Sequence, residues 1–274
     1  MTPQAQFPQR IVCLTEETTE TLYLLEEDWR IVGISGFTVR PPRARREKPR
    51  VSAFTSAKID RILKLEPDLV LGFSDLQADI AAELVRSGVE VHVFNHRSVA
   101  EILRMIRTLG GMIGCEDKTR VLVERLESSL NEVRARAALL PRRPRVYFEE
   151  WDEPQISGIR WVSELVGLAG GEDCFPELAA QSLGRNRIIA DPMEVPRRAP
   201  DIILGSWCGK KFRPEAVMSR PGWSNVPAIR GGFVREIKSA LILQPGPAAL
   251  TDGVRAIQAV IGEWVAAQSA CRGV

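Results

Sequence analysis

The densest group of side chains that could do chemistry is the run Glu149-Glu150-Trp151-Asp152-Glu153, in which four acids surround one tryptophan. Carboxylates resist burial unless they are paired with a cation or bound to a metal. The run therefore fits an acidic binding site for a cation, an amine or a chelated metal. It also fits general acid–base catalysis by Glu149 and Glu150. An exposed turn without a function would explain the same residues.

Other catalytic signatures are scarce. His92 and His96 are the only histidines, and the sequence contains no HExxH, GxSxG, GxxxxGK[ST] or GxGxxG motif. His92 falls in register with an expected strand, which favours a structural role. We therefore expect a binding protein that is not an enzyme, needs no cofactor and holds no metal site. A carboxylate- or metal-dependent enzyme that uses Glu149 and Glu150 is the alternative.

Aromatic and acidic residues follow several expected strands, where open α/β sheets bind their ligands. Aromatic rings offer a flat ligand a wide contact area at a low entropic cost. The candidate ligand-binding residues from this pattern are Thr15, Glu16, Glu17, Phe37, Phe73, Ser74, Asp75, Glu149, Glu150, Trp151, Trp161 and Trp207. A lone tryptophan packs in a core more often than it binds a ligand, but Trp151 and Trp207 directly follow strand ends.

Strand and helix patterns alternate over the first 115 residues. Short apolar runs that are typical of buried strands lie at 10–14, 30–35, 68–73 and 89–94. Helical patterns separate them, and this alternation predicts a parallel sheet covered on both faces. The Arg- and Pro-rich segment 38–50 is expected to be an exposed loop, with docking of a partner as the alternative.

A long amphipathic segment divides the chain. Apolar residues recur every three or four positions between 116 and 140, and neither Gly nor Pro interrupts them before Pro141. At ~1.5 Å per residue the segment would span about 37 Å. We expect a rigid helix between two lobes, with an N-terminal α/β lobe at 1–115, the interlobe helix at 116–142 and a C-terminal α/β lobe at 143–274.

The second half repeats the alternation of strands and helices, and it contains a repeated Pro-Asp motif. Strands are expected at 145–150, 201–207 and 233–237, and helices at 161–171 and 246–267. The segment KLEPDLVLGFSD at 64–75 is matched by RRAPDIILGSWC at 197–208. Each places Pro-Asp before an apolar run that ends in Gly, which predicts one copy of a structural repeat in each lobe.

Charge and cysteine content exclude other classes of protein. The chain has 37 basic and 35 acidic residues, a balance that argues against nucleic-acid binding. Its five cysteines are odd in number and form no CxxC pair, so we expect scattered reduced thiols rather than disulfides or a zinc site. The cysteines are Cys13, Cys115, Cys174, Cys208 and Cys271.

The start of the chain predicts its compartment. The opening MTPQAQFPQRIVCLTEE has no basic segment followed by an apolar one, and no run of about 18 apolar residues occurs anywhere. We therefore expect a cytoplasmic protein, with a periplasmic or cell-surface location as the alternative if a signal was removed.

The order of the segments resembles the iron-siderophore and cobalamin periplasmic-binding protein superfamily, the class III substrate-binding proteins of ABC importers with a helical backbone. The stretches that carry the resemblance are RIVCLTEETTETLYLL, VGISGFTVRPPRARREKPRVSAFTSAKIDRILKLEPDLVLG, SELVGLAGGEDCF and LILQPGPAALTDGVRAI. The resemblance implies two Rossmann-like lobes, mainly parallel sheets and limited hinge motion. We expect the protein to be a monomer. It also implies an interlobe cleft for cobalamin, haem or a ferric siderophore.

The resemblance extends to single positions. The matching cleft positions are Thr15 to Glu17, Phe54, Phe73 to Asp75, Glu149 to Trp151, Arg185 and Trp207. Family members usually carry small or neutral residues after the first strand, where this chain has Glu16 and Glu17.

Docking to an importer is the second point of departure. Importer-docking members present one surface Glu per lobe to arginines of an ABC permease. The aligned positions here hold Ala78 or Asp79 and Leu243 or Gln244. The resemblance thus implies either an ABC permease as partner or an intracellular task such as storing or sensing a ligand.

Overall fold

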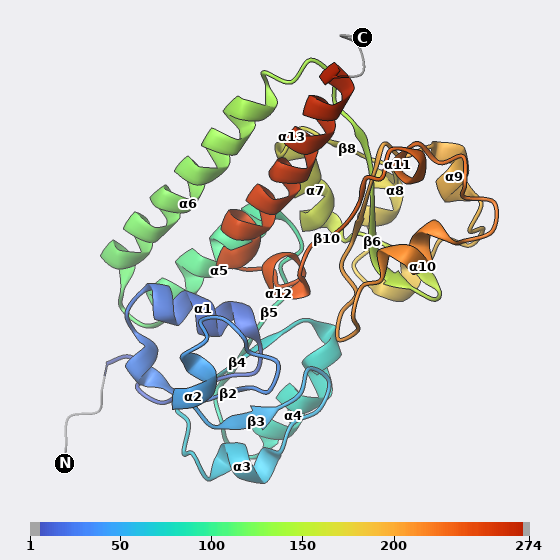
Figure 1. Cartoon of the computed structure of the whole chain (residues 1–274). Helices are drawn as coiled ribbons and strands as arrows, with labels where there is room; N and C mark the ends of the chain where they lie inside the picture. Colours follow the sequence, from blue (N-terminus) through green and yellow to red (C-terminus); the bar gives the residue numbers. More distant parts are fainter. Residues whose placement is uncertain (1–5, 271–274) are drawn as a thin grey trace, which may run out of the picture. The chain divides into compact units, whose positions relative to one another are not determined.

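The computed structural model describes residues 6–270, so Cys271 lies outside the described residues. The chain forms two compact units, each of which is α/β in character (Figure 1). The first unit contains the residues up to His96 and Ala100–Leu126. The second contains Arg97–Val99 and the residues from Glu127 onwards.

The first unit is built on a five-stranded parallel sheet with the order β3-β2-β1-β4-β5. Its strands are β1 (Ile11–Cys13), β2 (Ile31–Ser35), β3 (Arg50–Ser52), β4 (Leu69–Phe73) and β5 (Val91–Phe94). Its helical segments are α1 (Glu16–Leu24), η1 (Asp28–Arg30), α2 (Ala44–Glu47), α3 (Ile59–Leu63), η2 (Asp75–Gln77), α4 (Ala78–Arg86) and α5 (Val99–Met112). Every residue of β1 and β4 is buried, as a sheet covered on both faces requires.

The expected loop at 38–50 contains regular structure. Helix α2 and the first residue of β3 lie within it, because Ala44 and Val51 are buried and anchor the segment to the sheet. Two of its arginines are paired, since Arg40 Nε lies 2.9 Å from Glu20 and Arg43 Nη2 lies 3.2 Å from Asp28.

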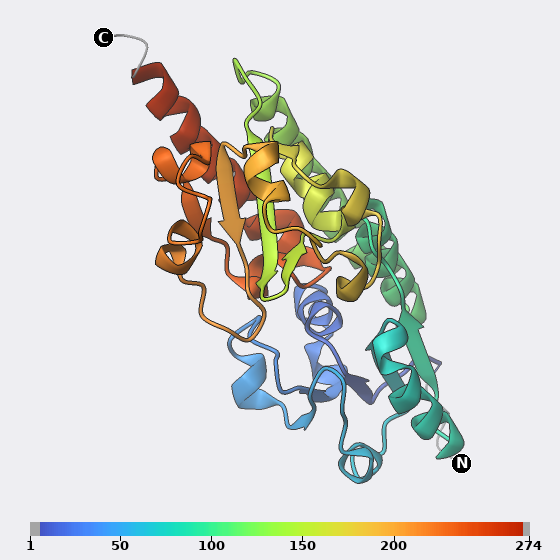
Figure 2. The same cartoon turned by 90° about the vertical axis from the view of Figure 1, so that its right-hand side faces the viewer.

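The second unit has a mixed sheet with the order β10-β9-β6-β7, to which β8 adds by pairing with β6. Its strands, seen in Figure 2, are β6 (Arg145–Asp152), β7 (Gln155–Ser157), β8 (Glu172–Asp173), β9 (Ile202–Gly205) and β10 (Val234–Glu236). Strand β7 is antiparallel to β6. The helical segments are α7 (Arg160–Leu168), α8 (Pro176–Ala179), η3 (Gly184–Asn186), α9 (Glu194–Arg198), α10 (Pro214–Met218), α11 (Pro227–Arg230), α12 (Ser239–Ile242), η4 (Ala249–Gly253) and α13 (Val254–Ala270).

The long helix α6 (Glu116–Ala137) follows the amphipathic stripe, and Leu122, Leu126, Leu130 and Val133 on it are buried. It ends three residues before the stripe does. The division between the two units falls inside this helix, after Leu126. The lobe limits at 115 and 143 stay a prediction.

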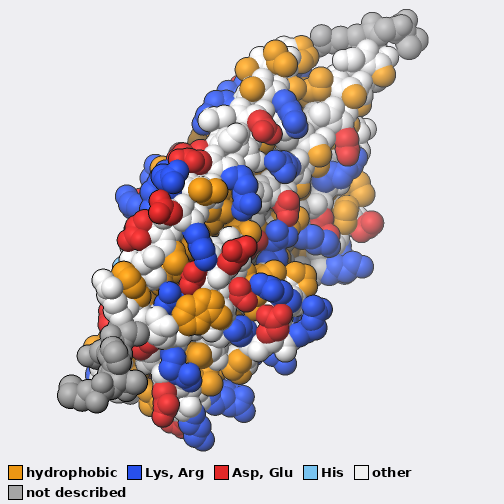
Figure 3. Space-filling view, turned by 90° about the vertical axis from the view of Figure 1, so that its left-hand side faces the viewer, with side chains coloured by type: hydrophobic (Ala, Val, Ile, Leu, Met, Phe, Trp, Pro, Cys, Tyr) orange, Lys and Arg blue, Asp and Glu red, His pale blue; other side chains and the backbone are white. Residues whose placement is uncertain are grey.

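The surface carries charges of both signs. Acidic and basic side chains are interspersed on the face seen in Figure 3. Cys13, Cys115 and Cys174 are free thiols, and burial raises the pKa of Cys13 to about 12. Within residues 6–270, no helix is both long and apolar enough to cross a bilayer.

The two copies of the repeated Pro-Asp motif lead into β4 and β9, and their aspartates make equivalent hydrogen bonds. Asp68 accepts the backbone N–H groups of Gln9 at 2.6 Å and Arg10 at 2.8 Å, and its own N–H donates to the Arg10 carbonyl at 3.0 Å. Asp201 accepts the N–H of Arg145 at 2.9 Å and donates to the Arg145 carbonyl at 2.8 Å. Each Pro-Asp aspartate thus joins the amino end of its strand to the first strand of its unit.

The glycines at the ends of the two motif copies have matching roles. A Cβ at Gly205 would lie 1.8 Å from a ring carbon of Phe212, and one at Gly72 would lie 3.0 Å from Oε1 of Gln77. Each glycine makes room for a side chain from the segment that follows its strand. These correspondences support the predicted repeat.

We predict that Asp68→Asn and Asp201→Asn both destabilise the fold, with the larger loss at Asp201. Asp201 is buried and also receives the guanidinium of Arg142 at 2.8 Å, whereas Asp68 is exposed. Losses of about 2 kcal/mol for Asp201 and about 1 kcal/mol for Asp68 are expected in urea denaturation. A larger loss at Asp68 would contradict the comparison.

Candidate ligand-binding site

Glu149 in β6 is the centre of a buried polar cluster, which we call the Glu149 cluster. Its side chain is fully buried and accepts both guanidinium nitrogens of Arg220, at 2.5 and 3.0 Å. It also accepts the indole N–H of Trp207 at 3.1 Å and the hydroxyl of Tyr147 at 3.0 Å. Burial and the nearby Glu149 raise the pKa of Tyr147 well above its usual value, so its hydroxyl remains a donor.

The next acids of the run are also paired. Glu150 receives a bidentate guanidinium from Arg187, at 2.6 and 2.9 Å, and only 2% of Arg187 is exposed. Asp152 receives the ammonium of Lys210 at 2.6 and 2.8 Å. The prediction of an acidic site therefore needs correction, because three of the four carboxylates are neutralised by nearby cations.

The same pairing weakens the enzyme alternative. A general base needs an accessible lone pair in reach of the proton that it removes. The carboxylates of Glu149 and Glu150 are instead held by Arg220 and Arg187. Within the described part of the chain, no three His, Cys, Asp or Glu side chains lie close enough to hold a metal ion.

The three candidate tryptophans of this unit differ in accessibility. Trp207 and Trp161 are buried, and the Trp161 indole donates to the Ile242 carbonyl at 2.8 Å. Trp151 is half-buried at the end of β6, and its indole donates to the Glu153 carbonyl at 2.9 Å. Of these rings, Trp151 is the one that a ligand can reach.

A lysine joins two of these rings. The Lys210 ammonium lies 5.4 Å from the centroid of Trp151 and 5.0 Å from that of Trp207, so it forms cation–π contacts with both. Arg185, which the family resemblance places at the site, is exposed in η3.

In the first unit, the residues directly after β1 form a helix. Helix α1 begins at Glu16, with Thr15 at its N-cap position, and Thr15 Oγ1 donates to Glu17 at 2.6 Å. Every residue from Glu16 to Tyr23 is buried although seven of these eight are Glu, Thr or Tyr. A helix with polar residues on all sides that is nevertheless buried is unusual, and its carboxylates need partners.

Glu16 differs from the other acids of α1. Glu17 accepts from Thr15, and Glu20 is paired with Arg40 at 2.9 Å. Glu16 is 6% exposed, and among residues 6–270 its own backbone N–H is the group that stabilises the charged carboxylate. Burial raises the pKa of Glu16 above its usual value.

The remaining candidates of the first unit include two accessible rings. Phe37, after β2, is 54% exposed and Phe54, after β3, is half-buried. Phe73 is 7% exposed, and its ring lies edge-on to His96 with centroids 5.0 Å apart.

The turn after β4 is strained. Ser74 has φ 65° and ψ 174°, a region that residues other than glycine rarely occupy. Its hydroxyl accepts the N–H of Leu76 at 3.2 Å, and the exposed Asp75 begins η2. Such strain costs about 1–3 kcal/mol and is concentrated at ligand-binding segments.

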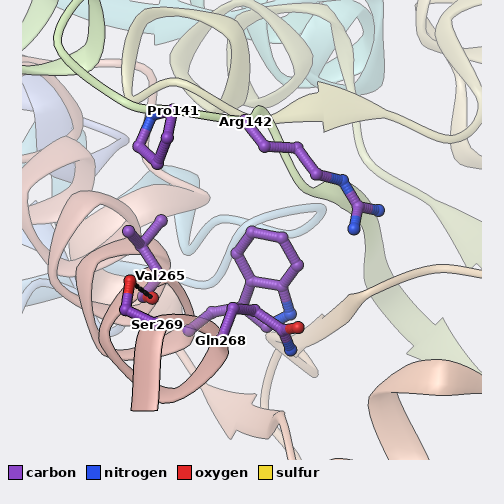
Figure 4. A pocket seen from close by; sticks show the side chains of 6 residues that line it. Pro141, Arg142, Val265, Gln268 and Ser269 are labelled. Atoms are coloured by element: carbon purple, nitrogen blue, oxygen red, sulfur yellow. Dashed lines mark hydrogen bonds between the residues drawn. The ribbon is translucent and has the colours of Figure 1, made fainter. Parts of the chain in front are cut away.

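Two cavities of about 290 Å³ lie among the described residues, one in each unit. One is lined by Pro141, Arg142 and Trp264, with Val265, Gln268 and Ser269 (Figure 4). Arg142 pairs with Asp201, which precedes β9, so this cavity lies at the amino end of the strand. The other is lined by residues of α1 and of the segment 40–43. Neither cavity includes a candidate residue.

Sequence reasoning missed the basic partners of the acidic run. Arg220, Arg187 and Lys210 lie 71, 37 and 58 residues from the acids that they pair with. The rule that buried acids need cations signals that such partners exist, but no local spacing identifies them.

We predict that Glu149→Gln destabilises the fold by about 3–5 kcal/mol, because it leaves the Arg220 guanidinium without its counter-charge. Arg220→Met should cost a similar amount, and the double variant should lose less than the sum of both. Urea denaturation measures the losses. Glu153→Gln, at an exposed acid in the same run, is the matched control. Additive losses would contradict the coupling.

We predict that Glu16→Gln stabilises the unliganded protein increasingly as pH rises from about 4 to 7. The raised pKa means that the folded state holds this proton more tightly than the unfolded state. The penalty is therefore absent below the unfolded pKa and complete above the folded one. Urea denaturation across this range measures the difference in free energy of unfolding between the variant and the wild type. A difference that shrinks with rising pH would contradict the raised pKa of Glu16.

Comparison with known proteins gives a family match along most of the chain. Residues 11–241 match the family described as periplasmic binding protein. An uncharacterised ABC transporter substrate-binding lipoprotein, YvrC of Bacillus subtilis, is 24% identical over 256 residues, which are 90% of this chain and 78% of that protein.

Two solved structures share the fold. The periplasmic vitamin B12-binding protein BtuF of Vibrio cholerae matches with a TM-score of 0.75 and 21% identity, over 94% of this chain and 98% of the other. The periplasmic haem-binding protein RhuT of Roseiflexus sp. RS-1 matches with a TM-score of 0.77 and 22% identity, over 92% and 99%. The expected class III fold with mainly parallel sheets is confirmed.

The expectation of a cytoplasmic location is wrong. The similar proteins are described as a lipoprotein and as periplasmic proteins, so a periplasmic or cell-surface location fits better. The expectation rested on the opening residues and on the lack of a long apolar run, and neither feature distinguishes the folded domain of a periplasmic protein from that of a cytoplasmic one.

The family match covers most of the chain, and the fold agrees with it along nearly the whole length. The chain is thus a ligand-binding protein rather than an enzyme, and it belongs to the periplasmic binding protein family.

Proposed function

We propose that this protein binds a corrinoid, haem or a ferric chelate against the carboxyl ends of its parallel strands. The observation that carries the proposal is a set of accessible rings at those ends, Phe37, Phe54 and Trp151, in a member of the periplasmic binding protein family. Flat, largely apolar ligands gain wide contact area from such rings. The names of the similar proteins supply vitamin B12 and haem as ligand classes. The sequence resemblance adds ferric chelates.

The remaining candidate residues take supporting roles in this proposal. Trp207 and Glu149 fix the end of β6 through the Glu149 cluster, and Lys210 holds the face of Trp151. A rigid support of this kind lowers the entropic cost of ligand binding. The expectation of a cleft between two lobes stays a prediction.

We further propose that an ABC permease receives the ligand. The description of YvrC as an ABC transporter lipoprotein supports this partner. Asp79 is exposed in the first turn of α4, and it is the acid at the position that the resemblance assigns to docking in the first lobe. Gln244, the second aligned position, carries no charge.

We predict that cyanocobalamin, dicyanocobinamide or haemin at micromolar concentrations quenches tryptophan fluorescence and gives a saturable isotherm in calorimetry. Trp151→Ala should weaken the binding by about tenfold, as expected for a central aromatic contact. Trp29→Ala is the matched control, because Trp29 is 56% exposed in η1 and is not a candidate residue.

Two results would contradict the proposal, one in full and one for Trp151 alone. Absence of binding by all these ligands and by a panel of ferric siderophores would refute the proposal. Equal losses in Trp151→Ala and Trp29→Ala would remove Trp151 from the site.

A further inference from the structure

Glu16 is a buried carboxylate that the described part of the chain does not neutralise. It is 6% exposed, and no Lys, Arg or His among residues 6–270 forms an ion pair with it. Glu149, Glu150, Asp152 and Glu20, by contrast, each face a basic side chain within 3 Å.

An unbalanced buried carboxylate is costly unless donors are supplied to it. A carboxylate offers about four acceptor positions, and here its own backbone N–H is the interaction that lowers the cost. The N-terminal end of α1 contributes a favourable dipole, but this is worth no more than about 2 kcal/mol. Glu16 therefore retains the capacity to accept N–H donors from a bound molecule.

Its position places this capacity at the proposed site. Glu16 follows β1, which is the central strand in the order β3-β2-β1-β4-β5. The carboxyl ends of parallel strands are the ligand-binding edge of such sheets. A molecule bound at this edge meets Glu16 near its middle.

The candidate ligands differ in what they would offer this carboxylate. A corrinoid carries primary amides around its ring, which are N–H donors. Haem carries propionates, which repel a buried carboxylate. The exposed Lys211 and Arg213 after β9 could attract propionates, but exposed charges are screened and contribute little.

Resting on the proposed function, we infer that Glu16 determines ligand specificity by accepting N–H groups from the edge of the ligand. The protein accordingly binds an amide-bearing corrinoid in preference to a carboxylate-bearing porphyrin.

The test compares two probes and three proteins. Dicyanocobinamide, which carries amides, and haemin, which carries carboxylates, are titrated by calorimetry into the full chain, Glu16→Gln and Asp60→Asn. Asp60 is the matched control, because it is also an acid in the first turn of a helix after a parallel strand, but is exposed. If Glu16→Gln is unfolded by circular dichroism, Glu16→Ser provides the neutral variant.

The wild type and Asp60→Asn should favour dicyanocobinamide, and the neutral variant should lose about tenfold of that preference. An unchanged preference, or a wild type that favours haemin, would overturn the inference while leaving the proposed function intact. Binding of neither probe by the wild type would overturn the inference. Absence of binding to ferric siderophores as well would overturn the proposed function with it.

Discussion

The Glu149 carboxylate is buried in the second unit and receives four hydrogen bonds, two from Arg220 and one each from Trp207 and Tyr147. These donors come from β6 itself, from the segment after β9 and from the segment after α10. The cluster therefore fixes the carboxyl end of β6 against two other segments of its unit. Its strength comes from low-dielectric surroundings, which also make the loss of any single partner costly.

The two units handle acids at their strand ends differently. The second unit pairs Glu149, Glu150 and Asp152 with basic side chains, which leaves the Trp151 ring as its accessible feature. In the first unit, no basic side chain among the described residues pairs with the buried Glu16. The units are built on equivalent strands, so this contrast lies in the side chains at the strand ends. In the proposed function, the ring would supply contact area and the carboxylate would supply discrimination.

Patterns of period two and 3.6 were sufficient to predict most of the alternating strands and the long helix α6, and the matching Pro-Asp segments indicated the equivalent strands that follow Asp68 and Asp201. They failed where non-local contacts decide the outcome. Helix α1 starts at Glu16 without a side-chain cap bond from Thr15, and strand β7 forms by pairing with β6 at a turn. The partners of the acidic run lie 37 to 71 residues away, beyond any local pattern. Trp161 and Trp207 proved buried because their indoles find acceptors in the core.

The central claim is that a ligand binds at the carboxyl ends of the strands. Hydrogen exchange followed by mass spectrometry, with and without saturating dicyanocobinamide, tests it most directly. The account predicts slower exchange at 15–25, 36–38, 53–55 and 150–157, and no change at the amino ends near 9–10 and 141–145. Protection confined to the amino ends, or to the cavity beside Trp264, would contradict it.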